Sequence, residues 1–155
     1  MPYSRKSSQI SYAQAIANYS TCMKTLEDIR HKDFSSRMIK YYKQQICYFI
    51  QQICEVMLKI QVLETGIPVN NLDYKRFRHD LYDIWDYATY TLQISIDIPQ
   101  EILNNLTRIT SWEVEGRYDC CKVVQLRTLE KMLEVIGDWI NRMTRGRKIH
   151  NPYRY

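Results

Sequence analysis

Three short polar strings hold the side chains of this chain that could do chemistry. They are QQICEVMLK at 51–59, HDL at 79–81 and RYD at 117–119. Ionisable and amide side chains can hydrogen-bond a ligand or move protons, and an arginine can hold a phosphate or a carboxylate through its planar fork. What the strings can do together depends on the helices that position them, because the surrounding sequence is helical in pattern.

The first string lies within a long helix that the sequence predicts over about 36–64. At 100° per residue, the apolar positions 46, 50, 53, 57 and 60 share one side of this helix. The opposite side carries Tyr41, Tyr48, Gln52, Glu55 and Lys59. Glu55 and Lys59 are one turn apart and can form an ion pair. This polar strip is either a solvated face with an ordinary ion pair or a contact surface lined by tyrosines.

The other two strings each precede a predicted helix. Asp80 could cap the helix that begins near 79, or the string could point the His79 imidazole and the Asp80 carboxylate into a groove. Asp119 could likewise cap the last helix, while Arg117 pairs with a carboxylate or holds a phosphate. For both strings a structural role competes with a ligand site.

Taken together, the order and spacing of the three strings resemble those of the prokaryotic HEPN domain (higher eukaryotes and prokaryotes nucleotide-binding), over residues 8–143. The resemblance implies an all-α, up-and-down bundle of four or five helices that forms a homodimer. It also implies a nucleotide, RNA or a partner nucleotidyltransferase as ligand. Carried over residue by residue, the ligand-binding positions are Gln52, Glu55, Lys59, His79, Asp80, Arg117 and Tyr118. Two residues depart from the family pattern, since Val56 stands where Lys is frequent and Asp119 where Pro is usual.

A branch of the same family comprises ribonucleases, whose signature is an Arg followed after four to six residues by a His on the last helix. Here that spacing occurs at Arg145 and His150. The pair suits RNA cleavage, with His as acid or base and Arg on the scissile phosphate. Gly146 and Pro152 disfavour a rigid helix across the segment, which follows the predicted last helix. We therefore expect a non-catalytic binding module, with a metal-independent ribonuclease toxin of a toxin–antitoxin pair as the alternative.

Apolar residues that recur every three or four positions predict helices over about 8–31, 36–64, 79–92, 99–109 and 123–144. Candidate N-caps of the second helix are Asp33, Ser35 and Ser36, and Asp97 is a candidate N-cap of the fourth. Gly66 can end the second helix in a left-handed conformation. No stretch alternates with period two, so no strand is expected. The sequence thus predicts a single HEPN-like bundle over 8–146 and a basic tail over 147–155.

Composition limits the class of protein further. The 155 residues are 45% hydrophobic and 25% charged, with only four Gly and four Pro, which is typical of a single soluble domain with long elements. The five cysteines are odd in number and show no zinc spacing, so we expect a reduced, cytoplasmic compartment and no metal site. No cofactor is expected either. Apolar runs are too short to span a bilayer, so no membrane contact is expected.

The net charge of +5 gathers toward the C-terminus, where two tyrosines accompany the basic residues. Such an end could contact phosphates and stack on bases, or simply keep the protein soluble. A structural partner protein without a small ligand is therefore the third interpretation of this sequence.

Overall fold

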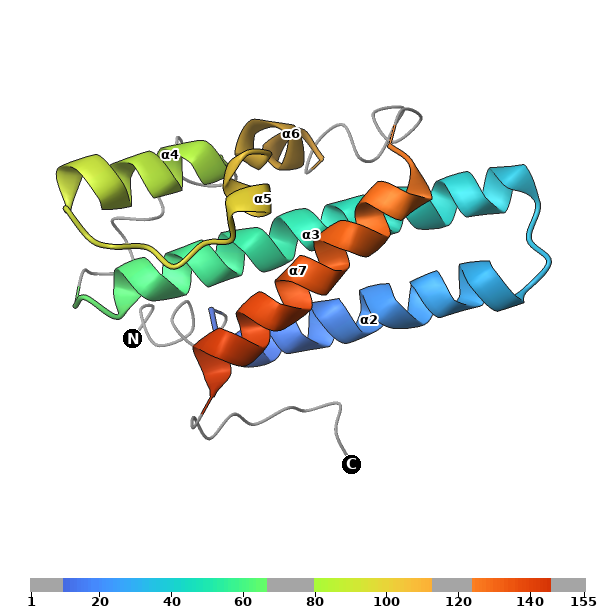
Figure 1. Cartoon of the computed structure of the whole chain (residues 1–155), viewed down its shortest axis with the longest axis horizontal. Helices are drawn as coiled ribbons and strands as arrows, with labels where there is room; N and C mark the ends of the chain where they lie inside the picture. Colours follow the sequence, from blue (N-terminus) through green and yellow to red (C-terminus); the bar gives the residue numbers. More distant parts are fainter. Residues whose placement is uncertain (1–9, 67–79, 113–123, 146–155) are drawn as a thin grey trace, which may run out of the picture.

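The computed structural model describes residues 10–66, 80–112 and 124–145, and every regular element in these ranges is helical (Figure 1). The elements are α2 (Tyr12–His31), α3 (Ser36–Leu63), α4 (Leu81–Asp86), the π-helix η3 (Tyr87–Thr91), α5 (Gln100–Leu103), α6 (Leu106–Ser111) and α7 (Leu126–Thr144). The predicted all-α fold class and helical bundle are confirmed.

The long helix α3 lies at the centre of the bundle. It runs antiparallel to α2, and α7 crosses obliquely and contacts both, while α4, α5 and α6 lie on the side of α3 away from α2 (Figure 1). As a result every residue from 53 to 62 is buried. Among the described helices, α3 alone is long and apolar enough to cross a membrane, and 67% of its apolar window is buried inside the bundle.

Local capping chemistry sets several of the helix ends that the sequence predicts. The Ser35 hydroxyl accepts from the Met38 amide at 3.2 Å and caps α3. Just beyond α3, Gly66 has a φ of +90°, the left-handed conformation that glycine adopts without strain. Asp80 caps α4 by accepting from the Asp83 amide at 3.1 Å.

The predicted helix over 99–109 is wrong in detail, because two short helices, α5 and α6, take its place. The break lies at Asn105, whose side-chain amide donates to the Glu101 carbonyl at 2.7 Å and competes with the helical backbone ladder. Asp97 does not cap this segment either. Pro99 holds the N-cap position of α5, without a side-chain cap.

The predicted third helix changes type halfway along. In η3 the Leu92 amide donates to the Tyr87 carbonyl at 2.9 Å, five residues back, where an α-helix would bond four residues back. The π-helix is followed by Gln93, a non-glycine residue with a φ of 54°. The Ile94 amide then donates to the Ala88 carbonyl at 2.9 Å and closes this end of the helix.

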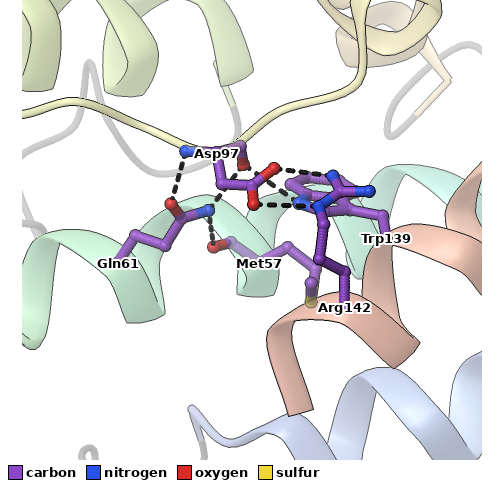
Figure 2. A network of polar contacts seen from close by, with 5 residues as sticks. All are labelled: Met57, Gln61, Asp97, Trp139 and Arg142. Atoms are coloured by element: carbon purple, nitrogen blue, oxygen red, sulfur yellow. Dashed lines mark hydrogen bonds and ion pairs between the residues drawn. The ribbon is translucent and has the colours of Figure 1, made fainter. Parts of the chain in front are cut away.

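Asp97 fastens the segment between η3 and α5 to the two long helices beneath it (Figure 2). The side-chain amide of Gln61 on α3 bonds both backbone groups of Asp97, donating to its carbonyl at 2.8 Å and accepting from its amide at 2.7 Å. On α7, the Trp139 indole donates to the same carbonyl at 2.9 Å. The Arg142 guanidinium holds the Asp97 carboxylate with two bonds of 3.0 and 2.6 Å, which raises the pKa of Arg142.

Candidate functional site

The sequence-predicted site residues fall partly within the described structure. Gln52, Glu55 and Lys59 lie on α3, and Asp80 lies at the start of α4. Arg145 is the exposed C-cap of α7. The other predicted positions, His79, Arg117, Tyr118 and His150, lie outside the described residues.

A continuous row of polar side chains follows α3 and contains three of the predicted residues. Gln52 donates to the Gln51 side-chain oxygen at 2.7 Å, and Gln51 donates to the Glu55 carboxylate at 3.4 Å. The other carboxylate oxygen of Glu55 lies 3.4 Å from the Lys59 ammonium. We call Gln51, Gln52, Glu55 and Lys59 the polar row. Gln51 belongs to the first polar string, but the resemblance does not assign it a ligand-binding role.

The predicted Glu55–Lys59 ion pair is confirmed, but the solvated face on which it was expected is wrong. The side chains of Glu55 and Lys59 are only 12% and 11% exposed, and Gln51 is fully buried. Helices α2, α4, α6 and α7 contact α3, and every residue of α3 from 53 to 62 is buried. The same polar strip is open toward the start of α3, where Tyr41 is 56% exposed.

Burial changes what the ion pair does for the protein. Removing two charges from water costs free energy that their mutual attraction roughly offsets, so a buried pair seldom stabilises a fold beyond an apolar pair of similar volume. Removing one partner alone is strongly destabilising, because the other charge stays buried. A hydrogen bond from Gln51 supplies a further partner to the Glu55 carboxylate. The polar row is therefore not explained by a gain in net stability.

The HDL string acts structurally where the structure describes it. The Asp80 carboxylate caps α4, and the Leu81 amide donates to the Thr110 hydroxyl at 3.0 Å, which ties α4 to α6. Leu81 itself is fully buried. The capping interpretation is confirmed for Asp80.

The sequence analysis did not anticipate a groove of about 590 Å³ between α2 and α7. Its α7 wall carries two cations, Arg127 and Lys131, followed by two acids, Glu134 and Asp138. An ion pair of 3.3 Å between Arg30 and Glu130 joins the two helices at the cationic end. The signal in the sequence is the spacing of four, three and four between these charged positions, which places them on one exposed stripe of α7.

Tyr19 and Gly137 mark the closest approach of α2 to α7 in this groove. A Cβ atom on residue 137 would lie 2.5 Å from the Tyr19 hydroxyl oxygen, so only glycine fits without a shift. Burial, followed by the negative charge of Asp138, raises the pKa of Tyr19. Tyr19 therefore stays neutral at physiological pH and serves as a packing residue.

Nucleophilic and metal chemistry finds little support in the part of the chain that the structure describes. No group of three or more His, Cys, Asp or Glu residues there could hold a metal ion. Cys22, Cys47 and Cys54 are buried and form no disulfide. Burial raises the pKa of Cys22 and of Cys54 to about 12, so neither supplies a thiolate at neutral pH.

No family model, no curated protein and no solved structure matches this chain. The structure defines the protein as an all-helical bundle with a polar row buried in its central helix. The resemblance to the HEPN domain comes from the three polar strings of the sequence.

Proposed function

We propose that this protein is a non-catalytic, HEPN-type binding module that engages a nucleotide, RNA or a partner nucleotidyltransferase through the polar row. The supporting observation is the nearly buried Glu55–Lys59 pair, linked to the amides of Gln51 and Gln52 in the central helix. A bundle gains no net stability from such a pair, so a role in recognition accounts for it better than a role in folding.

The burial of the polar row favours a small ligand or a protein partner over RNA at this place. RNA and single-stranded DNA are held by exposed cations along an open groove. Lys59 is nearly covered and already paired with Glu55, whereas Gln52 is partly exposed. A base or a phosphate oxygen that reaches the edge of the row would contact an amide and an ammonium group.

Thermal unfolding with and without ligand tests this proposal. The double variant Glu55→Gln/Lys59→Met removes the charges but keeps the approximate volumes. The matched control is Asp28→Asn/Lys32→Met, which removes an exposed ion pair with the same separation of 3.4 Å and the same spacing on α2. A nucleotide at about 100 times its Kd adds about 2.7 kcal/mol of stability. We expect ATP, GTP or another nucleotide to raise the Tm of the wild type and of the control, but not that of the polar-row variant.

Two results would contradict this assignment. An equal rise in Tm for both double variants would place the nucleotide site elsewhere. A flat response to all nucleotides and to a short RNA would favour the structural-partner interpretation, which a stable complex with a neighbouring gene product would then support.

The ribonuclease alternative requires Arg145 and His150 to act as a pair. Arg145 has a ψ of 126°, so the chain leaves the helical conformation at that residue. The family signature places both residues on the last helix, and this departure favours the non-catalytic proposal. Cleavage of RNA by the wild type that disappears in His150→Ala would favour the ribonuclease. Intact RNA after long incubation would support the non-catalytic proposal.

The charge order on α7 suits a homodimer in which two copies of this helix lie antiparallel. With the two-fold axis between Lys131 and Glu134, Arg127 meets the partner's Asp138 and Lys131 meets the partner's Glu134. A two-fold axis repeats each contact, as an isologous interface requires. Exposed ion pairs contribute about 0.2–1 kcal/mol each, so this interface alone gives a weak dimer.

Sedimentation equilibrium tests the dimer with compensating charge reversals. We expect Arg127→Asp/Lys131→Glu to weaken self-association, because like charges then face each other. Adding Glu134→Lys/Asp138→Arg to the same chain should restore it. If the variant with all four substitutions does not regain self-association, this antiparallel register is excluded.

A further inference from the structure

Two exposed tyrosines and a partly buried tryptophan form a contiguous group on α4 and η3. The Tyr82 and Trp85 ring centroids are 5.8 Å apart, and Trp85 and Tyr90 are also 5.8 Å apart with their planes at 89°. Tyr82 is 46% exposed and Tyr90 is 66% exposed, although large apolar rings usually find cover in a bundle. The two tyrosine rings therefore face solvent on either side of Trp85, which is edge-to-face with Tyr90.

The π-helix brings Tyr90 to this group. In a regular α-helix, residues five apart point about 140° away from each other, so Trp85 and Tyr90 would not meet. The bond from the Leu92 amide to the Tyr87 carbonyl widens the turn and rotates Tyr90 back toward Trp85. π-turns are rare and occur frequently at functional sites, which makes the position of this one informative.

The helical spacing brings an acidic residue, Asp86, to the same side of the helix as Tyr82. Asp86 is four residues after Tyr82, four before Tyr90 and next to Trp85 in the chain. The Asp86 carboxylate makes no hydrogen bond or ion pair to any residue that the structure describes, while Asp80, six residues earlier, uses its own in a cap. Asp86 therefore offers a carboxylate to a cation that approaches the rings from outside.

We propose that Tyr82, Trp85, Asp86 and Tyr90, the aromatic patch, bind an arginine side chain of a partner protein. The faces of aromatic rings carry negative potential and attract cations, most strongly Trp and Tyr. A planar guanidinium can stack on a ring while it donates two hydrogen bonds to a carboxylate, which a lysine ammonium cannot do in the same geometry.

The charge of the patch separates this partner from the other ligands that stack on aromatic rings. A nucleic acid would bring phosphates close to the carboxylate of Asp86, and like charges repel. A free small cation would find only an open surface, where each cation–π contact is weak. An arginine in a polypeptide gains further contacts from the chain that carries it. The patch lies on α4 and η3, so this inference does not rest on the ligand of the polar row.

NMR titration of the full chain tests the proposal, with the Trp85 indole signal as the readout. The probe is a short Gly/Ser peptide with two arginines, and its partner probe has citrulline at both positions, which keeps the shape but removes the charge. The variants Asp86→Asn and Tyr90→Ala test the patch. Tyr41→Ala, a change of another exposed tyrosine outside the patch, is the control.

We expect the arginine peptide to shift the Trp85 signal in a saturable and salt-sensitive way, at least ten times more tightly than the citrulline peptide. Each patch variant should weaken binding at least tenfold, and Tyr41→Ala should leave it unchanged. Equal binding of both peptides, or an unchanged affinity in Asp86→Asn, would overturn the proposal. A response of the same signal to choline or to a short RNA, with no response to the arginine peptide, would also overturn it.

Discussion

At the scale of single residues, burial decides what the ionisable groups of this protein can do. Two ion pairs of the same type, spacing and distance occur on neighbouring helices, Asp28–Lys32 in solvent and Glu55–Lys59 in the core. Their chemistry in isolation is the same, but desolvation separates their energetic roles. Comparing them measures the effect of burial on one kind of contact.

We expect Lys59→Met to lower the free energy of unfolding by about 3–5 kcal/mol, because it leaves the nearly buried Glu55 carboxylate without the Lys59 ammonium. Lys32→Met should change it by no more than about 0.5 kcal/mol. Urea unfolding of both variants makes the comparison. Adding Glu55→Gln to Lys59→Met should recover most of the loss, and similar costs for the two single variants would show that burial does not matter here.

The buried thiols predict a loss of stability in alkali. Folding raises the pKa of Cys54 to about 12, above the value of about 8.5 in an unfolded chain. The stability contributed by the protonated thiol is therefore complete below about pH 8.5 and is lost as the pH rises toward 12. Between these two pH values, each such thiol makes the free energy of unfolding fall more steeply, by up to about 1.4 kcal/mol per pH unit.

Urea unfolding from about pH 8 to about pH 11 should show this dependence as a shallower decline in Cys54→Ala than in the wild type. The packing lost in the variant shifts the whole curve and leaves its slope unaffected. Parallel curves would mean that the Cys54 thiol ionises alike in both states.

At the scale of elements, two features of the helices cannot be read from the helical pattern. Gly137 lets α7 approach Tyr19 of α2. The π-turn of η3 determines where the ring of Tyr90 lies relative to Trp85. Neither feature changes the hydrophobic periodicity from which the helices are predicted.

We expect Gly137→Ala to destabilise the protein by about 1–3 kcal/mol, because the new methyl group would overlap the Tyr19 ring and hydroxyl. Tyr19→Phe in the same chain should recover part of that loss, since it removes the nearest atom. Guanidinium unfolding of the single and double variants gives the coupling between the two positions. Alanine would instead stabilise an uncrowded helix by up to about 1 kcal/mol, and that result would contradict the close approach.

Helix ends that depend on local chemistry were predictable from the sequence. Ser35, Gly66 and Asp80 act within a turn of their own helices, where capping rules apply directly. Asp97 reads as a cap by the same rules, but its partners Gln61 and Arg142 lie far away in the sequence. A tertiary contact overrode the local preference.

In the candidate site, too, the local contact was predictable from the sequence and the tertiary packing was not. Spacing along α3 predicts the Glu55–Lys59 pair, because residues four apart share a helical face. Their burial depends on how the other helices pack around α3, and no pattern within α3 carries that information. The groove between α2 and α7 likewise requires the packing of two helices from opposite ends of the chain.

At the scale of the whole molecule, Asp97 links the two long core helices α3 and α7 to the segment that precedes α5 (Figure 2). The buried amide of Gln61 and the exposed guanidinium of Arg142 contribute differently to this link. Hydrogen bonds to partly buried backbone groups are costly to remove, whereas exposed ion pairs are not.

We expect Gln61→Leu to lower the free energy of unfolding by about 1–3 kcal/mol, because the Asp97 amide loses its acceptor. Arg142→Met should cost less than about 1 kcal/mol, and high salt should reduce that cost further. Chemical denaturation at low and high salt separates the two effects. A larger cost for Arg142→Met would show that the ion pair holds the segment in place.

The Asp97 link also has a kinetic consequence. Its bonds join residues 36, 42 and 45 positions apart in the sequence, whereas α2 and α3 are joined by a connection of only a few residues. Contacts between sequence neighbours close with little loss of chain entropy, so the α2–α3 hairpin can form before α7 docks. We therefore expect the Asp97 bonds to form late, after the rate-limiting step. Gln61→Leu should therefore speed unfolding and leave the refolding rate almost unchanged. The Asp97 link would then determine how long the folded state persists before it unfolds.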